Sequence, residues 1–485
     1  MRKKTVIFSF VLIILCALAI RFAPILSQRD FWYDEAFTGI LLKAPFGQMN
    51  QMIFDDVHPP LYYWLAKPWA AVFGYTPFGI RTFSLAMGIA TIMSIYWIGN
   101  KMFNQKAGLF AAMITAISPF AIEYSQEARM YALFGLLFLW ATWFFCRSIE
   151  TGKTKYYVLW GIFSGLSFYT HYLALFFFIL FYITYVAYQV IFNKQKIFRS
   201  LFGEKRFWLG IGVIAVFFAS WLKIFYSHMM KGNLGWIDPS HLSDLPKTLQ
   251  IFFFGHPPGT GGVPWSNEFI AFFDGASAGI LIFTFIVASI TFAWIKNKKR
   301  RELFVLTMMS FGTLLFLIVL SHVNIKLYVA RYFMPTAVLI YLITGAIAGY
   351  VFTKKWAWVA VLLIYGGMLF MLKQPIPYQS GWTQVSDLSS DIIAPNTIIV
   401  AGNPFDYTSA RYYFGENRVR YYNKGNPRED FSGWVVVGNE NRITDLSEIK
   451  DYPNMVIVDG TCDWKGIELI EQRRLEQLAV CTLKQ

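Results

Sequence analysis

The chain has 485 residues, of which 56% are hydrophobic and 19% aromatic, while only 15% are charged. This composition excludes an ordinary soluble globular protein and indicates an integral membrane protein with many spans. The formal net charge of +14 does not indicate a nucleic-acid partner, because most basic residues occupy short polar gaps between apolar runs, where the positive-inside rule accounts for them.

Apolar segments long enough, or nearly long enough, to span a bilayer number about eleven. The first follows residues 1–4 and is expected to remain as a helix, because no small-x-small cleavage site of a signal peptide comes after it. Residues 170–172 form only a weak divider between two of the others. The segments lie at about 5–26, 81–103, 107–122, 130–148, 157–171, 172–192, 207–229, 277–295, 302–321, 331–352 and 356–373.

The distribution of lysine and arginine favours one orientation of these segments. If the N-terminus is cytoplasmic, every gap on the cytoplasmic side is basic, as the positive-inside rule requires. We therefore expect a multi-pass protein of the cell membrane whose loops at 27–80, 124–129, 230–274 and 322–328, and whose tail from residue 374, lie outside. The cytoplasmic gaps hold Lys101, Lys106, Arg147, Lys153, Lys155, Lys194, Lys196, Arg199, Lys205, Arg206, Lys296, Lys298, Lys299, Arg300, Arg301, Lys354 and Lys355.

Two adjacent carboxylates, Asp34 and Glu35, stand between aromatic residues just after the first apolar segment. One interpretation is an aromatic belt at the membrane interface that carries two solvated acids. The other is a catalytic acid pair, because an apolar wall that excludes water makes a carboxylate a stronger base. The charged residues of the other outer loops favour the second interpretation.

The loop at 27–80 is long for a connection in a compact membrane bundle, so we expect it to carry structure or function. Within it, His58 precedes two prolines, which hold it in an extended or turn geometry. The aromatic residues after them suit a helix lying on the bilayer, and two prolines are also simply how such a helix begins.

Another group of charged residues lies at the end of the third apolar segment. If residues 118–131 are helical, Glu123 and Glu127 face the same way, and so do Glu127 and Tyr131. Arg129 at a membrane boundary is costly unless it pairs or meets an anion. It therefore either locks two helices through a glutamate or binds an anionic ligand.

Further cations lie near the end of the bundle, on the same predicted face. Lys326 and Arg331 bring two positive charges, and Tyr332 follows them directly. A cluster of cations above a bilayer is what a lipid phosphate needs, and arginine offers it two parallel donors.

The composition changes after residue 373, and the tail at 374–485 is expected to form a small extracytoplasmic α/β domain. Short apolar runs that end in glycine-containing turns predict buried strands, and the segments between them predict short helices. The predicted strands are 397–400, 434–437 and 455–458, and the predicted helices are 404–413 and 446–449.

Four cysteines are too few for a disulfide framework or a thiolate metal site. Cys16 and Cys146 fall inside apolar segments, where cysteine usually serves only packing. Cys462 and Cys481 are the only cysteines of the tail, and each borders a strand-like run. We expect these two to form a disulfide, since an oxidising exterior permits one.

Several motifs occur together in one order: Trp32-Tyr33-Asp34-Glu35-Ala36-Phe37, His58-Pro59-Pro60-Leu61-Tyr62-Tyr63, Tyr124-Ser125-Gln126-Glu127-Ala128-Arg129-Met130-Tyr131 and Arg331-Tyr332. They resemble the bacterial membrane glycosyltransferases of the GT-C superfamily, in the dolichyl-phosphate-mannose–protein mannosyltransferase-like group. The aminoarabinose transferase of lipid A belongs to the same broad set. The resemblance covers roughly residues 1–350 and implies a GT-C-like transmembrane domain over 1–373, followed by the separate tail domain.

The resemblance implies a polyprenyl-phosphate sugar donor and inverting transfer of a hexosyl or pentosyl group to a lipid, glycan or protein acceptor. By motif position Asp34 serves as general base, with Glu35 as helper or metal ligand. Such transfer needs one carboxylate to take the acceptor's proton, whereas the leaving phosphate needs only charge stabilisation. The implied donor-binding residues are His58, Glu127, Arg129, Tyr131, Lys326, Arg331 and Tyr332.

Some members of this family hold a divalent metal near this site. Hard ligands for one could come from Glu35, Asp55, Asp56 and His58. Their spacing is not a metal signature, so the sequence leaves the presence of a metal open.

A transporter or flippase of lipid-linked sugars is the alternative function, since it would use the same basic and aromatic face for binding. Transporters place charges at mid-membrane on broken helices and often show inverted repeats. This chain shows no such repeat, and its acids and cations gather at one boundary of the membrane. These features favour the transferase.

Overall fold

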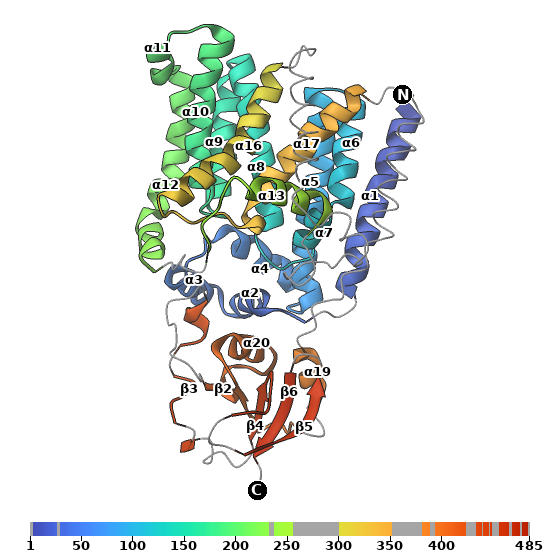
Figure 1. Cartoon of the computed structure of the whole chain (residues 1–485), viewed down its shortest axis with the longest axis vertical. Coiled ribbons are helices and arrows are strands. Elements are labelled where there is room, and N and C mark those ends of the chain that lie inside the picture. Colours follow the sequence, from blue (N-terminus) through green and yellow to red (C-terminus); the bar gives the residue numbers. More distant parts are fainter. Residues whose placement is uncertain are drawn as a thin grey trace. The chain divides into compact units, whose positions relative to one another are not determined.

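The computed structural model describes residues 3–26, 30–231, 237–255, 300–351 and, in the tail, 381–388, 393–422, 433–438, 440–445, 447–448, 455–464, 468–475 and 478–483 (Figure 1). The chain divides into two compact units. The helical unit comprises residues 1–23, 84–223 and 234–375. The mixed unit comprises residues 24–83, 224–233 and 376–485.

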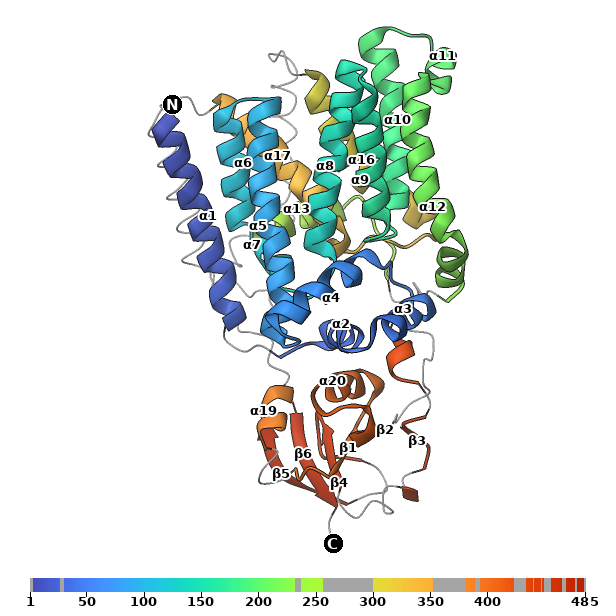
Figure 2. The same cartoon turned by 180° about the vertical axis from the view of Figure 1, so that it is seen from behind.

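Long apolar helices make up the helical unit, because a chain in hydrocarbon must satisfy its backbone polar groups internally (Figure 2). The helices in or entering this unit are α1 (Lys3–Leu26), α5 (Pro77–Met102), α6 (Gln105–Ile117), α7 (Pro119–Ser125), α8 (Tyr131–Thr151), α9 (Thr154–Phe168), α10 (Ala174–Asn193), α11 (Ile197–Phe202), α12 (Lys205–Lys231), α13 (Asp244–Phe254), α16 (Arg300–His322), η1 (Ala330–Phe333) and α17 (Met334–Val351).

Seven helices among the described residues are long and apolar enough to cross a membrane, or eight if α6 and α7 count as one span bent by 65°. The predicted segment at 157–171 is the shorter helix α9, of 15 residues. The predicted segments at 277–295 and 356–373 lie outside the described residues. A many-spanning helical membrane protein is therefore confirmed, while the number eleven is not.

Small residues let α6 and α17 pack closely. A Cβ atom added at Gly345 would collide with the backbone of Ala111, and one at Gly349 with the backbone of Ala107. Close approach at small residues is a common way for membrane helices to gain packing contacts where hydrophobic burial offers little. Larger side chains at these two glycines would push the helices apart.

The long loop after α1 forms three helices of the mixed unit: α2 (Tyr33–Lys43), α3 (Phe46–Asp55) and α4 (Leu61–Phe73). The expectation that this long loop carries structure is thus confirmed. The helix after the two prolines begins at Leu61, as the proline pair predicts.

The tail forms a six-stranded sheet with the order β3-β2-β1-β4-β6-β5. The first four strands in this order run parallel, and β6 pairs antiparallel with both of its neighbours. The tail elements are α19 (Trp382–Asp387), β1 (Ile398–Ala401), α20 (Pro404–Phe414), η3 (Glu416–Arg418), β2 (Val419–Tyr422), η4 (Trp434–Val436), β3 (Arg442–Ile443), β4 (Met455–Asp459), β5 (Leu469–Leu475) and β6 (Leu478–Leu483).

The predicted strands at 397–400 and 455–458 are confirmed as β1 and β4, and the predicted helix at 404–413 as α20. The prediction of a strand at 434–437 is wrong, because this segment forms the 3-10 turn η4. A short apolar run cannot be assigned to strand or helix by periodicity alone. Of the predicted helix at 446–449, only Ser447 and Glu448 are described.

Cys462 and Cys481 form the predicted disulfide, with Cα atoms 5.8 Å apart. Cys481 lies on β6 opposite Ile457 of β4, and Cys462 follows the end of β4. The antiparallel pairing of these strands brings the two cysteines together.

Hydrogen bonds tie the first loop to the tail within the mixed unit. The carboxylate of Asp30 accepts from the backbone N–H groups of Gly381, at 2.7 Å, and Thr383, at 3.0 Å. Lys43 lies 3.7 Å from the ring centroid of Tyr412 on α20, a cation–π contact. The predicted domain boundary at 373 and 374 falls outside the described residues and stays a prediction.

Candidate active site

Asp34 lies in the first turn of α2, which begins at Tyr33. Its side chain is half-buried, and the side chains of Trp32 and Tyr33 beside it are half-buried too. The amino end of a helix carries a partial positive charge, which stabilises an anionic side chain in the first turn. Asp34 is thus a half-buried ionisable group at the amino end of a helix.

Glu35 occupies a different environment from its neighbour. Its side chain is 1% exposed and accepts two hydrogen bonds from Arg81, at 2.7 Å from Nε and 2.5 Å from Nη2. Arg81 is fully buried and also donates to the backbone carbonyl of Asp30, at 2.7 Å. This bidentate pair joins α2 to the start of α5 and neutralises two buried charges.

His58 is held by Asp56. Its Nδ1 atom lies 2.5 Å from Oδ2 of Asp56, and because an ionised carboxylate only accepts, Nδ1 carries the hydrogen. Burial opposes the ionisation of Asp56, but the charge and hydrogen bond of His58 and the N–H groups of Val57 and Gly433 hold its pKa below the usual value. The imidazole is thereby fixed in orientation.

The ring of Phe37, on helix α2, packs near the ring of His58. Its ring centroid lies 5.9 Å from that of His58 and 6.4 Å from that of Tyr63 on α4. Phe37 follows Asp34 by almost one helical turn, so both residues lie on the same side of α2. His58 therefore packs near the side of α2 that also carries Asp34.

Of the four residues considered as metal ligands, only Asp56 and His58 contact each other, and they form an ion pair. Glu35 binds Arg81, and Asp55 is exposed on α3, where it accepts from Gln51 at 2.7 Å and lies 3.9 Å from Lys231. In the part of the chain that the structure describes, no group of three or more His, Cys, Asp or Glu side chains could hold a metal ion. These four residues do not fit a shared metal site.

The helical unit contains a cluster of aromatic and cationic residues, here called the aromatic cluster: Tyr124, Tyr131, His171 and Tyr332, with Arg129 and Arg331. The centroid of Tyr131 lies 5.2 Å from that of Tyr124 and 6.4 Å from that of Tyr332. The His171 ring lies 4.7 Å from Tyr332. The charges of Arg331, Arg129 and Glu127 are close enough to act on Tyr131.

Arg129 is 2% exposed, and its backbone carbonyl accepts from the hydroxyl of Ser84, at 3.3 Å. Arg331 lies in the 3-10 helix η1, and Lys326 lies half-buried on the segment before it. Two arginines, which sequence analysis placed on one face, thus share an environment around Tyr131.

Residues 118–131 do not form one continuous helix, so the condition for a shared face of Glu123 and Glu127 is not met. Helix α7 starts at Pro119 and ends at Ser125, and Glu127 lies in the irregular stretch before α8 begins at Tyr131. Ser118 caps α7, and the chain bends there because the residue before a proline is disfavoured in a helix. Glu123 and Glu127 therefore do not share a helix face.

The sequence did not indicate three residues that lie near Glu35 or in the aromatic cluster: Asp30, Arg81 and His171. Arg81 offered a signal, since a charged residue at the start of an apolar segment is costly unless it is paired. His171 stood out only as a polar divider between two spans. Asp30 offered no signal beyond its place beside the motif.

The comparisons with known proteins agree with this architecture. The family model for dolichyl-phosphate-mannose-protein mannosyltransferase matches residues 57–223, about a third of the chain. The apo structure of ArnT from Cupriavidus metallidurans matches with a TM-score of 0.64 and 12% identity over 97% of both chains. ArnT bound to undecaprenyl phosphate matches with a TM-score of 0.62, at the same identity and coverage.

An Archaeoglobus fulgidus oligosaccharyltransferase, in complex with Zn and sulfate, matches with a TM-score of 0.57 and 14% identity, over 93% of this chain and 68% of the other. Among curated proteins nothing matches. The predicted resemblance to GT-C membrane glycosyltransferases is confirmed, and the fold of this chain is similar to theirs.

Proposed function

We propose that this chain transfers a sugar from a polyprenyl-phosphate-linked donor to an acceptor at the membrane, with inversion and with Asp34 as general base. The observation that carries the proposal is the fold likeness to ArnT over 97% of both chains, since one of the ArnT structures holds undecaprenyl phosphate. The match to a family named for a dolichyl-phosphate-linked donor supports the same donor class.

The choice of Asp34 over Glu35 rests on their environments. Glu35 gives both carboxylate oxygens to Arg81 and is buried, so it serves the structure. Asp34 is half-buried, so it combines access to an acceptor with partial exclusion of water. An acceptor hydroxyl needs one carboxylate to remove its proton as the new bond to the sugar forms.

The departing phosphate needs positive charge rather than a protein acid. Arg129 and Arg331 supply it in the aromatic cluster, and their planar forks suit phosphate oxygens. Within the same helical unit, Tyr131, Tyr332, Glu127 and Lys326 would help to position the donor's head group. His58 of the mixed unit is a further candidate for donor binding. The donor-binding role of each residue remains part of the proposal.

The same proposal places the enzyme in the cell membrane, with a cytoplasmic N-terminus and with the first loop and the tail outside. The transferred group is a hexose or a pentose, and the acceptor a lipid, a glycan or a protein. The basic residues of every predicted cytoplasmic gap support this orientation.

The test is transfer of a labelled sugar from polyprenyl-phosphate donors by the purified full chain in liposomes. A panel of hexose and pentose donors is incubated with membrane extracts as acceptor, and both labelled product and released polyprenyl phosphate are measured. Stoichiometric release and transfer are expected for at least one donor. Movement of donors across the bilayer with their sugar intact would instead assign the flippase alternative.

A further inference from the structure

We infer that the helical unit binds the head group of a zwitterionic aminophospholipid in two adjoining pockets at the end of the bundle away from the aromatic cluster. The inference is independent of the proposed transferase activity. It rests on pocket shape, charge and aromatic walls within the helical unit alone.

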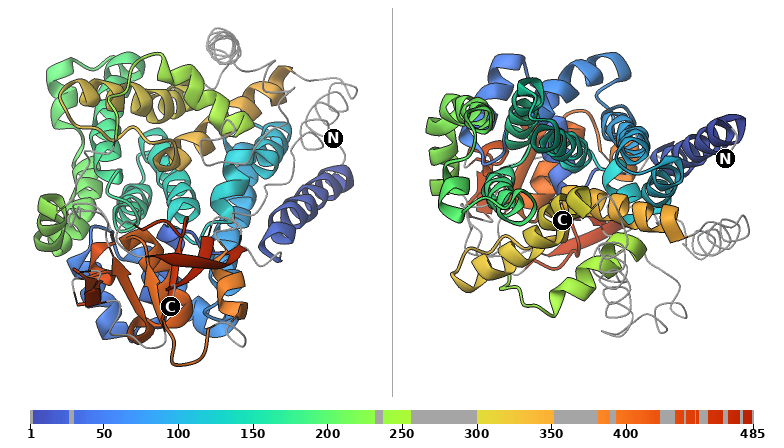
Figure 3. Two further views of the ribbon diagram at one scale, coloured as in Figure 1. Left: turned by 60° about the horizontal axis from the view of Figure 1, so that its bottom comes forward. Right: turned by 90° about the horizontal axis from the view of Figure 1, so that it is seen from above.

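The location follows from where the helices end. The pockets are lined from the last turns of α5, α8 and α10 and from the first turns of α9 and α16. The aromatic cluster uses the opposite ends of these helices, since Tyr131 begins α8 and His171 lies between α9 and α10. The right-hand view of Figure 3 shows α8 to α10, in teal and green, seen along their axes.

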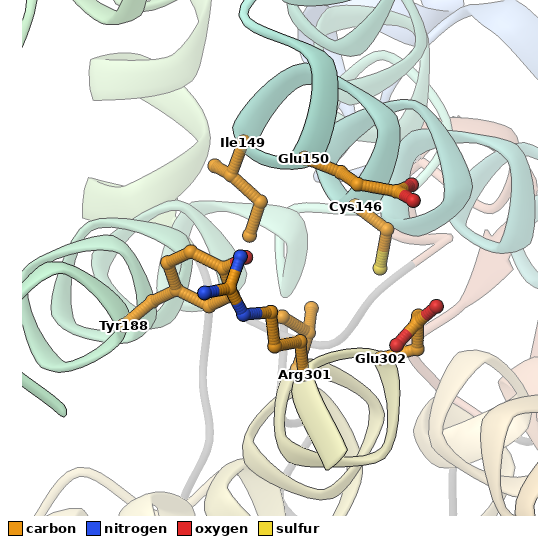
Figure 4. Close-up of a pocket in the computed structure, with 7 residues that line it drawn as sticks. Cys146, Ile149, Glu150, Tyr188, Arg301 and Glu302 are labelled. Atoms are coloured by element: carbon orange, nitrogen blue, oxygen red, sulfur yellow. The ribbon is translucent and has the colours of Figure 1, made fainter. Parts of the chain in front are cut away.

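The first pocket has a volume of about 320 Å³. Figure 4 shows Arg301 of α16 extending toward Tyr188 of α10, while Glu302 lies on the side of Cys146 and Glu150 of α8. The guanidinium of Arg301 is 5.7 Å from the ring centroid of Tyr188, a cation–π contact, and it also hydrogen-bonds this tyrosine. One wall is therefore cationic and the other carries two carboxylates.

The second pocket has a volume of about 410 Å³ and shares Cys146, Glu150 and Glu302 with the first. It adds a wall of three aromatic rings, Trp97, Trp143 and Tyr156. The centroids of Trp97 and Trp143 lie 4.8 Å apart in a T-shaped arrangement, and those of Trp143 and Tyr156 lie 6.2 Å apart.

Two further cations complete the second pocket. Arg147 pairs with Glu150 at 2.6 Å and lies 5.7 Å from the ring centroid of Tyr156. Lys101 is exposed at the end of α5, with its ammonium 5.9 Å from the ring centroid of Trp97. The two shared carboxylates, of Glu150 and Glu302, thus lie among cationic side chains in the lining of the two pockets.

This arrangement selects for a ligand with both charges. An ammonium group suits the two glutamates and the aromatic wall, because carboxylates and ring faces both attract cations. A phosphate suits Lys101, Arg147 and Arg301. Glu150 and Glu302 would repel a purely anionic head group, and the three cations would repel a purely cationic one. Tryptophan and tyrosine at this level match the interface where lipid head groups lie.

The probe is native mass spectrometry of the full chain in detergent with added phosphatidylethanolamine or phosphatidylglycerol of identical acyl chains. The wild-type protein should retain phosphatidylethanolamine about 5-fold better, the factor expected from one ion pair and one cation–π contact at partly exposed positions. Replacing both acids (Glu150→Gln with Glu302→Gln) should abolish this preference.

Glu204→Gln is the matched control, because Glu204 is exposed at the same end of the bundle but lines neither pocket. It should keep the preference. Thermal unfolding without lipid establishes that the variants fold alike, and the wild-type comparison of the two lipids needs no variant. Equal or stronger retention of phosphatidylglycerol by the wild type would overturn the inference, as would a preserved preference in the double variant.

Discussion

Asp34 and Glu35 are neighbours in the chain but have separate tasks, and single substitutions distinguish them. Asp34→Asn keeps the size of the side chain but cannot accept a proton. We expect turnover to fall roughly 100-fold or more, the usual contribution of a general base. Donor binding should survive, since the base contacts the acceptor. The measurements are transfer of labelled sugar and donor affinity.

Asp55→Asn is the matched control for this experiment, because Asp55 is an exposed acid of the same loop. It should transfer sugar at nearly the normal rate. Near-normal transfer by Asp34→Asn would rule out Asp34 as the base.

Glu35→Gln should act on folding rather than directly on chemistry. It leaves the buried guanidinium of Arg81 without a counter-charge, and removing one partner of a buried pair costs about 3 kcal/mol in the free energy of unfolding. Denaturant unfolding in detergent measures this loss. If Glu35→Gln unfolds like the wild type yet transfers no sugar, Glu35 has a catalytic role after all.

At the scale of elements, the aromatic cluster gathers residues from α7, the stretch between α7 and α8, α8, η1 and the turn between α9 and α10. Arg129→Lys and Arg331→Lys keep the charge but lose the planar fork. We expect about 10-fold weaker donor binding in each, as for the loss of a charge-assisted hydrogen bond. Binding of a fluorescent polyprenyl phosphate measures it.

Arg206→Lys serves as the control for this pair, because Arg206 is an exposed arginine at the start of α12. It should bind the donor normally. If donor affinity is unchanged in both cluster variants, these arginines do not bind the donor and only stabilise the packing of helices.

Helix α20 carries Asp406, a carboxyl group that makes the stability of the tail depend on pH. Burial and the nearby charge of Asp459 raise the pKa of Asp406 to about 6, against a partial opposing effect of Asn403. A carboxyl whose pKa is higher in the folded state stabilises the fold while it is protonated. That contribution is present below about pH 4 and is lost as the pH rises through 6.

Asp406→Asn should therefore flatten the pH dependence of tail unfolding between pH 4 and 7, by up to about 3 kcal/mol. Limited proteolysis of the full chain across this range measures it. Asp387→Asn, at an exposed position on α19, should keep the wild-type slope. A slope unchanged in Asp406→Asn would show that other groups control the tail's response to pH.

At the scale of the whole molecule, the proposed function requires that the first loop and the tail lie outside the cell. Single cysteines are placed at Ser386 and Asn297 in a chain whose Cys16 and Cys146 are replaced by serine. A membrane-impermeant thiol reagent applied to intact cells should label the first and miss the second, because the basic gaps predict a cytoplasmic position for Asn297. The opposite pattern would contradict the proposed orientation and the mechanism.

The sequence by itself determined the class of the protein. Apolar length and the placement of lysine and arginine are local properties, so they predicted the many spans without knowledge of packing. The motifs around Asp34, His58 and Arg129 indicated the GT-C resemblance. In the tail, β1, β4 and α20 followed from local patterns, and the cysteines from their number and setting.

Only the tertiary structure decided which charged residues pair. Glu35 and Arg81 are 46 residues apart in the chain, and they pair only because helices pack after they form. The ring contact between His171 and Tyr332 depends on helix packing in the same way. The same holds for Asp30 and Asp56, whose carboxylates bind backbone N–H groups of the distant tail. Local patterns carry no information on such partners, because burial and pairing at each position depend on segments far away in the chain.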